Sequence, residues 1–265
     1  MNRKPIFAAN WKMNKGASET EDFIKSFLSK LQGQDFPCEI VIAPPFVSLA
    51  KLADLLHTAT AVQNAHAIQI AAQNCSQFDS GAYTGDISGQ FLNKLGCKYV
   101  LVGHSERRTV HNESDEVLNA KVKAAYRHGV TPVLCVGEGL EIRQAGNHVQ
   151  HTLNQLRADV EGLTAEEAAQ LVVAYEPVWA IGTGEVAGPE DAQEMCAAIR
   201  AELATLFGED VAAKVRLLYG GSVKANNAAA ILNERDVDGV LVGGASLDPA
   251  EFANIVRFES HLLTD

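Results

Sequence analysis

Eight short runs rich in valine, isoleucine and leucine recur along the 265-residue chain. Each run is almost continuously apolar, as strands covered on both faces are, and no Asn-Gly or Asp-Gly hairpin turn joins one run to the next. Their starts lie 23 to 44 residues apart, which leaves room for the crossover helix that parallel neighbours need. The runs are Pro5–Asn10, Cys38–Ala43, Ile68–Gln73, Lys98–Gly103, Val130–Val136, Leu171–Glu176, Val215–Tyr219 and Asp238–Val242.

Helical patterns lie between these runs. Ser18 and Glu21 have the spacing of a capping box, and the apolar residues that follow share one helical face. Asp248, Pro249 and Glu251 supply an N-cap, a first-turn proline and the cap's return partner for the last helix. The apolar face of the first helix comprises Phe23, Ile24, Phe27, Leu28 and Leu31.

Eight strand-helix units in a chain of this length predict an α/β fold, a single-domain (β/α)8 barrel over residues 1–265. The main alternative is an open doubly wound sheet. That fold is favoured by a Gly-x-Gly-x-x-Gly turn after the first strand, whereas Asn10-Trp11-Lys12-Met13 stands there. No Pro/Gly/Ser-rich linker indicates a second domain.

The net charge, the apolar stretches and the cysteines indicate which partners and which compartment to expect. A net charge of −11 repels nucleic acid and anionic lipid, so neither is an expected partner. The longest apolar stretch, Leu171–Val186, contains Glu176 and Pro177, which argues against a membrane span. Five unpaired cysteines, and the absence of a basic-then-apolar segment before Trp11, predict a cytoplasmic protein with free thiols.

Polar residues and glycines follow nearly every run, where the carboxyl ends of barrel strands form the catalytic face. Gly-Gly-Ser at 220–222 and Gly-Gly at 243–244 predict a phosphate cradle, because glycines let backbone N–H groups approach an anion. The alternative is a pair of turns that need glycine for backbone reasons alone. Two such turns in adjacent final units favour a phosphate ester as ligand.

Three side chains at these strand ends are candidates for catalysis. Glu176 closes an apolar strand before Pro177 and is a candidate general base, or else a carboxylate paired with a cation. His104 precedes a predicted short helix at Ser105, whose N-terminus favours a neutral imidazole; the alternative is a buried structural histidine. Lys12 is placed to stabilise an oxyanion, or else is a solvated turn lysine.

Two further features bear on chemistry. The segment Pro177, Val178, Trp179, Ala180, Ile181, Gly182, Thr183 and Gly184 has an apolar centre between stiff and flexible residues, which predicts a lid with an exposed Trp179; the alternative is a packed loop. Cys135 lies inside the fifth run, so a packed thiol is expected. No histidine or cysteine spacing predicts a metal site.

Five ordered motifs resemble those of the triosephosphate isomerase family, from Lys4 to about Val256. They are Asn10–Asn14, Gly103–Arg108, Ala174–Gly184, Tyr219–Ser222 and Val242–Leu247. The resemblance implies a TIM barrel that interconverts dihydroxyacetone phosphate and glyceraldehyde 3-phosphate, in glycolysis and gluconeogenesis, without cofactor or metal. In that family a glutamate is the base and a neutral histidine is the electrophile, and the resemblance implies the same pair here.

The resemblance also implies roles for individual residues. Glu176 would move a proton between two carbons, His104 would polarise the carbonyl, and Lys12 with Asn10 would steady the oxyanion. Glu106, Ser105 and Cys135 would support these groups. The phosphate would bind Gly182, Ser222, Gly243 and Gly244, together with Asn10 and Lys12.

The family is usually a homodimer, and the resemblance places its interchain loop at Thr84, Gly85 and Asp86. Thr84 would reach Asn10 of a second copy. Asp86 stands where the family commonly has glutamate, and Arg107 would be its partner. Glu185 replaces the lysine usual after Gly-Thr-Gly, so the end of the lid departs in charge.

Two other functions remain open from the residues alone. An aldolase on the same barrel would use Lys12 to form a Schiff base. A barrel that binds phosphate esters or a protein without catalysis is also compatible with the fold.

Overall fold

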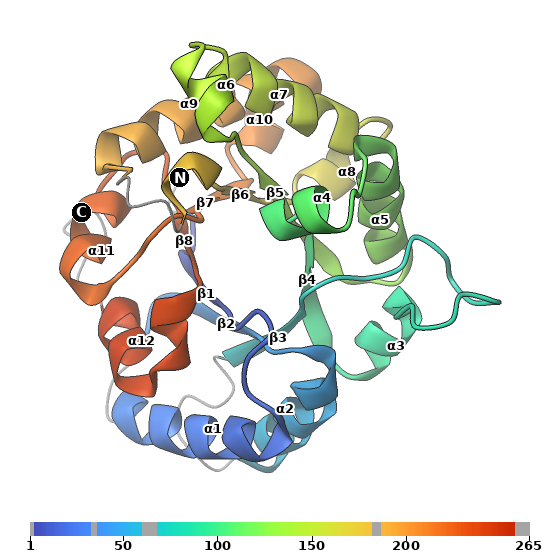
Figure 1. Cartoon of the computed structure of the whole chain (residues 1–265), viewed down its shortest axis with the longest axis vertical. Helices are drawn as coiled ribbons and strands as arrows, with labels where there is room; N and C mark the ends of the chain where they lie inside the picture. The colour runs from blue at the N-terminus through green and yellow to red at the C-terminus, as the bar shows by residue number, and fades with distance from the viewer. Residues whose placement is uncertain (1–2, 33–35, 60–67, 182–186, 258–265) are drawn as a thin grey trace.

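The computed structural model describes residues 3–32, 36–59, 68–181 and 187–257. Its strands are β1 (Ile6–Asn10), β2 (Glu39–Ala43), β3 (Ile68–Ala72), β4 (Cys97–Val102), β5 (Thr131–Val136), β6 (Val172–Tyr175), β7 (Arg216–Tyr219) and β8 (Gly239–Val242). All pair in parallel and in chain order, and β1 also pairs with β8, so the sheet closes into a barrel (Figure 1). The (β/α)8 prediction is confirmed, and the open sheet is excluded.

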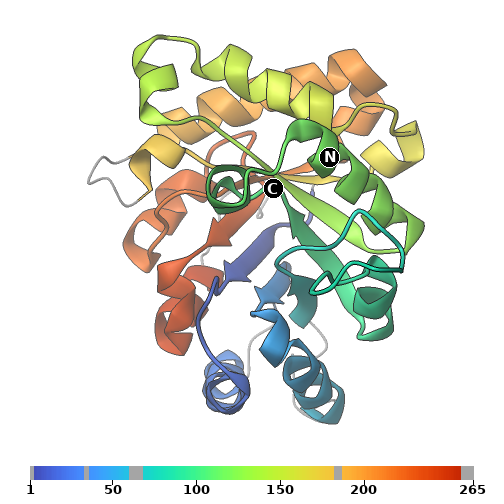
Figure 2. The ribbon, with the colours of Figure 1, turned by 45° about the vertical axis from the view of Figure 1, so that its right-hand side comes forward.

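Helices surround the barrel (Figures 1 and 2). They are α1 (Ala17–Leu31), α2 (Phe46–Thr58), α3 (Gly89–Lys94), α4 (Ser105–Val110), α5 (Asp115–Arg127), α6 (Leu140–Gln144), α7 (His148–Asp159), α8 (Ala165–Ala168), α9 (Pro189–Phe207), α10 (Glu209–Ala212), α11 (Ala225–Leu232) and α12 (Pro249–Val256), with short 3-10 helices η3 (Val178–Ala180) and η4 (Gly244–Leu247). Every predicted run became a strand whose bounds differ by at most one residue at either end. Glu176 and Gln73 thereby fall just outside β6 and β3.

The first helix begins differently from the prediction. The carboxylate of Glu19 accepts the backbone N–H of Gly16 at 2.7 Å, so the capping contact starts at Gly16 and Ser18 lies inside the first turn. Glu21 instead pairs with two lysines. The predicted apolar face is confirmed, since all five of its side chains are buried.

The last helix keeps its predicted cap but not the return contact. Asp248 Oδ1 accepts the N–H groups of Ala250 and Glu251 at 2.7 and 2.9 Å, and Pro249 occupies the first helical position. The carboxylate of Glu251 accepts the N–H of Ala225 at 2.8 Å instead. It therefore ties α12 to the start of α11, where the Asn227 side chain also accepts the N–H of Lys224 at 2.8 Å.

Two layers of apolar side chains form the core. One layer, which includes helix residues such as Phe27 and Phe252, packs between the strands and the helices. The other consists of strand residues alone and fills the barrel. Cys135 belongs to this inner layer and is fully buried, which raises the pKa of its thiol. The packed-thiol prediction is confirmed.

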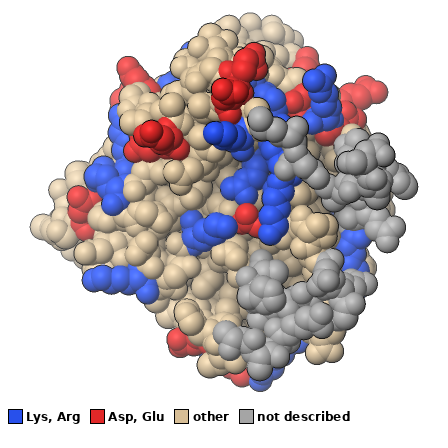
Figure 3. All heavy atoms as spheres, turned by 180° about the vertical axis from the view of Figure 1, so that it is seen from behind, with Lys and Arg blue, Asp and Glu red and all other residues tan. Residues whose placement is uncertain are grey.

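Ion pairs close the barrel at the starts of its strands. Glu39 accepts Lys98 Nζ at 2.8 Å and the Tyr99 hydroxyl at 2.6 Å through Oε2, and Arg216 at 3.0 Å through Oε1. Burial alone would raise the pKa of Glu39, but these partners outweigh it and hold that pKa below its usual value. Figure 3, viewed from behind, shows Lys and Arg side chains gathered on this face. We call the cluster of Glu39, Lys98, Tyr99 and Arg216 the barrel floor.

Candidate active site

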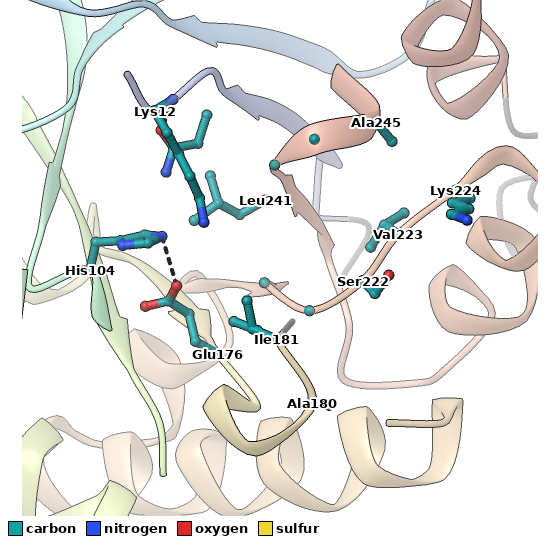
Figure 4. A pocket seen from close by; sticks show the side chains of 15 residues that line it. Lys12, His104, Glu176, Ala180, Ile181, Ser222, Val223, Lys224, Leu241 and Ala245 are labelled. Atoms are coloured by element: carbon teal, nitrogen blue, oxygen red, sulfur yellow. Dashed lines mark hydrogen bonds and ion pairs between the residues drawn. The ribbon is translucent and has the colours of Figure 1, made fainter. Parts of the chain in front are cut away.

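A cavity of about 390 Å³ opens at the carboxyl ends of the strands. Figure 4 shows the side chains of Lys12, His104 and Glu176 converging on it. The prediction that these three strand ends meet at one rim is therefore confirmed. Lys12 and Glu176 lie 164 residues apart in the sequence. The cavity is lined by Asn10, Lys12, His104, Glu176, Ala180, Ile181, Gly220, Gly221, Ser222, Val223, Lys224, Leu241, Gly243, Gly244 and Ala245.

The carboxylate of Glu176 is 2% exposed and is bound by hydrogen-bond donors. Oε2 accepts the backbone N–H of Ser105 at 2.8 Å, and Oε1 lies 2.9 Å from His104 Nε2 and 3.3 Å from Ser105 Oγ. Its own backbone N–H donates to Val136 O at 2.8 Å. Such a carboxylate, desolvated and free of any Arg or Lys partner among the described residues, is suited to general base chemistry.

His104 is the N-cap of α4 and projects its ring into the cavity. Nδ1 accepts the backbone N–H of Glu106 at 3.2 Å. A ring nitrogen that accepts a hydrogen bond carries no proton, so the proton of the neutral ring is on Nε2. The ring therefore offers an N–H donor to the cavity, as the predicted helix start at Ser105 implied.

Lys12 has a backbone φ of 52°, in the left-handed region that few residues other than glycine adopt. Its N–H donates to Asn10 Oδ1 at 3.0 Å, and its ammonium lies 2.8 Å from Glu106 Oε1. Burial alone would raise the pKa of Glu106, but the hydrogen bond and the charge of Lys12, together with nearby His104, outweigh burial and lower that pKa. The ion pair holds the Lys12 ammonium beside the cavity.

The glycine turns form the other side of the cavity. Ser222, Gly243 and Gly244 all line it, and η4 begins at Gly244. Gly182, predicted to bind the phosphate, lies outside the described residues, as do Thr183, Gly184 and Glu185. Lys224, at the cap of α11, also lines the cavity and was not singled out by the sequence.

The described part of the predicted lid is packed. Trp179 is 8% exposed, its ring lies 4.4 Å from the Arg143 guanidinium, and its backbone N–H donates to the backbone oxygen of Glu138 at 3.3 Å. The expectation of an exposed Trp179 was wrong, because the η3 turn after Pro177 directs the indole against α6 rather than into solvent. Trp179 and Ala180, at the centre of the segment, are thus buried.

The loop between β3 and α3 projects from the body of the protein (Figure 1). Asp86 accepts the Ser76 hydroxyl at 2.6 Å, and Arg107 donates to Glu113 at 2.6 Å. The expected Asp86–Arg107 pair was wrong within this chain, because the short aspartate is held by a serine of its own loop while Glu113 binds Arg107. Thr84 and Gly85 are exposed.

Two contacts near the site were not predicted from the sequence. A Cβ at Gly137 would lie 1.8 Å from the carbonyl oxygen of Glu176, so only glycine lets the base's backbone lie this close. Gln73 donates to Lys12 O at 2.8 Å and to Ala43 O at 2.9 Å. Both residues end or follow an apolar run, which is the signal that located the other site residues.

The described residues contain no group of three His, Cys, Asp or Glu side chains that could hold a metal ion. No helix among them is both long enough and apolar enough to cross a bilayer.

Comparison with known proteins gives full-length matches. A family model described as triosephosphate isomerase matches residues 5–259. Proteins named triosephosphate isomerase from Streptomyces avermitilis and Streptomyces coelicolor are each 52% identical over 257 residues, which is 97% of this chain and 98% of theirs. One of the same name from Mycobacterium marinum is 50% identical over 256 residues, 96% of each chain.

Proposed function

The chain belongs to the triosephosphate isomerase family, and we propose that it performs that reaction with Glu176 as the base and His104 as the electrophile. It is an isomerase that interconverts dihydroxyacetone phosphate and glyceraldehyde 3-phosphate, a step of glycolysis. The observation that carries the mechanism is the convergence of Glu176, His104 and Lys12 on one cavity bordered by glycine turns.

Substrate binding uses the two sides of the cavity. The phosphate lies against the backbone N–H groups of Ser222, Gly243 and Gly244, where a dianion gains most from donors that need no reorganisation. Lys12 and Lys224 place positive charge at the cavity of a chain whose net charge is −11. The carbonyl of the substrate then lies between Lys12 and His104 Nε2.

The chemistry moves one proton between carbons. Glu176 leaves Ser105 and removes a proton from the carbon beside the carbonyl; that C–H electron pair forms the C=C bond, and the carbonyl π pair moves to oxygen. His104 Nε2–H and the Lys12 ammonium stabilise this oxyanion, and His104 transfers a proton between the two oxygens of the enediolate. Protonated Glu176 returns its proton to the other carbon.

A turnover assay tests the function. The purified protein, given glyceraldehyde 3-phosphate, should form dihydroxyacetone phosphate, followed through a coupled reductase that oxidises NADH. Borohydride added with substrate should trap nothing on Lys12, since no Schiff base forms. A trapped lysine adduct would favour an aldolase, and absent turnover would favour a barrel that only binds.

The projecting loop supports a homodimer, with Thr84 reaching Asn10 of the second copy. Phe78 and Tyr83 stack 3.9 Å apart on this loop and are about 40% exposed, and Met13, next to Lys12, is 93% exposed. A second cavity, of about 330 Å³, lies at the root of the loop between Asp86 and Arg107. Apolar projections beside a cavity are what a self-complementary interface needs.

Tyr83→Asp tests the dimer, because it places a charge in the proposed interface. Light scattering after gel filtration should give twice 28.4 kDa for the unmodified chain and 28.4 kDa for the variant. Leu206→Asp, on α9, is the control: this leucine is also 40% exposed but is remote from the loop, and the variant should stay dimeric. A monomeric unmodified chain would contradict the proposal.

A cytoplasmic location belongs to the same proposal. All five cysteines are buried and free, which suits a reducing compartment.

A further inference from the structure

Lys12 has a left-handed backbone conformation, which lysine and most other residues rarely adopt. Among the described residues it is one of three that are not glycine and have a positive φ. Strained backbone of this kind persists only where surrounding contacts enforce it, and it gathers at functional sites. The question is therefore which groups enforce it here.

The Lys12 peptide is held from both sides. Asn10 Oδ1 accepts its N–H at 3.0 Å, and Gln73 Nε2 donates to its carbonyl oxygen at 2.8 Å. The same Gln73 nitrogen donates to Ala43 O at 2.9 Å, and that oxygen also accepts the N–H of Trp11 at 3.1 Å. One amide thus joins the end of β2, the turn after β1 and the residue after β3.

We propose that Gln73 is a positioning residue for the reaction, which acts by holding the left-handed Lys12 turn so that the ammonium stays beside the substrate's anionic groups. The inference rests on the proposed role of Lys12. Gln73 itself does not line the cavity, so it has no contact with substrate. Its effect passes through one backbone carbonyl, and without that contact the turn relaxes toward negative φ and carries the ammonium away.

Gln73→Met tests the inference, since methionine has nearly the same length and no donor. We expect kcat/KM to fall about 10- to 100-fold, through a higher KM and a lower kcat together, because a shift of about 1 Å at a reacting group costs up to about 100-fold. Gln90→Met, exposed in the first turn of α3, is the matched control and should leave both constants unchanged. Thermal unfolding shows whether each variant is folded.

A double-mutant cycle separates positioning from general stability. Lys12→Gly removes the ammonium and also accepts positive φ without strain. In that background Gln73→Met should change kcat/KM by less than about twofold, because its target is gone. An additional loss as large as in the Lys12 background would overturn the inference, since Gln73 would then act elsewhere.

The two proposals fail in different ways. If Lys12→Gly alone keeps normal kinetics, the assigned role of Lys12 is wrong. If Lys12→Gly is impaired while Gln73→Met stays within twofold of the unmodified enzyme, only the inference is wrong. Should Gln73→Met not fold, Gln73→Asn keeps the amide one methylene short, and a loss of about threefold or more with the same non-additivity supports the inference; none overturns it.

Discussion

Glu176→Gln should lower kcat about 10⁴-fold and change KM little, because an amide cannot accept the proton that the carboxylate removes. The replacement has the same shape, and its carbonyl oxygen still accepts the Ser105 N–H that now lies 2.8 Å from Oε2. Steady-state kinetics with glyceraldehyde 3-phosphate measure the loss. Binding of substrate should persist, since the phosphate contacts are made by other residues.

Glu161→Gln is the matched control for that experiment. Glu161 is exposed in the turn after α7, and its replacement should leave kcat and KM unchanged. Turnover of Glu176→Gln within tenfold of the unmodified enzyme would show that another group takes the proton.

His104→Gln should lower kcat about 10²- to 10³-fold, the usual effect of removing one preorganised donor at an oxyanion. Glutamine can donate a hydrogen bond but cannot pass a proton between two oxygens. Nor can its flexible side chain reproduce the position of a ring that accepts the Glu106 N–H at 3.2 Å. The fold-loss in kcat/KM should be the same in both directions, because the ratio of the two kcat/KM values is the equilibrium constant, which no enzyme variant changes.

His111→Gln is the control for this loss, since His111 is exposed at the other end of α4. Nitrogen-15 NMR adds a direct test: in the unmodified enzyme at neutral pH, the His104 ring should carry its proton on Nε2. A ring protonated on Nδ1 instead would contradict the assigned donor.

The strands and the three central site residues could be predicted from the sequence because barrel strands are continuous apolar runs, and whatever ends such a run lies at the catalytic face. Glu176, His104 and Lys12 each follow or close a run. Each of these residues can thus be identified from the sequence around its own strand, without knowledge of which strands pair.

Contacts between separate strands could not be predicted in this way. Ser105 binds Glu176 across 71 residues, and the close approach of Gly137 to the same backbone depends on how two strands pair. Trp179 and Glu251 were misjudged for the same reason: each looks available to its own segment, but a neighbouring helix offers it a better partner. Tertiary packing decides which partner each of these side chains contacts, and a local sequence pattern does not reveal it.

The barrel floor and the cavity lie at opposite ends of the same strands. Glu39 and Arg216 start β2 and β7, whereas Glu176 and Ser222 follow the ends of β6 and β7. Resistance to heat and speed of turnover are therefore adjusted by different residues. Selection for growth at higher temperature should accumulate changes at the floor first, where ion pairs can be exchanged without disturbing a single atom that meets the substrate.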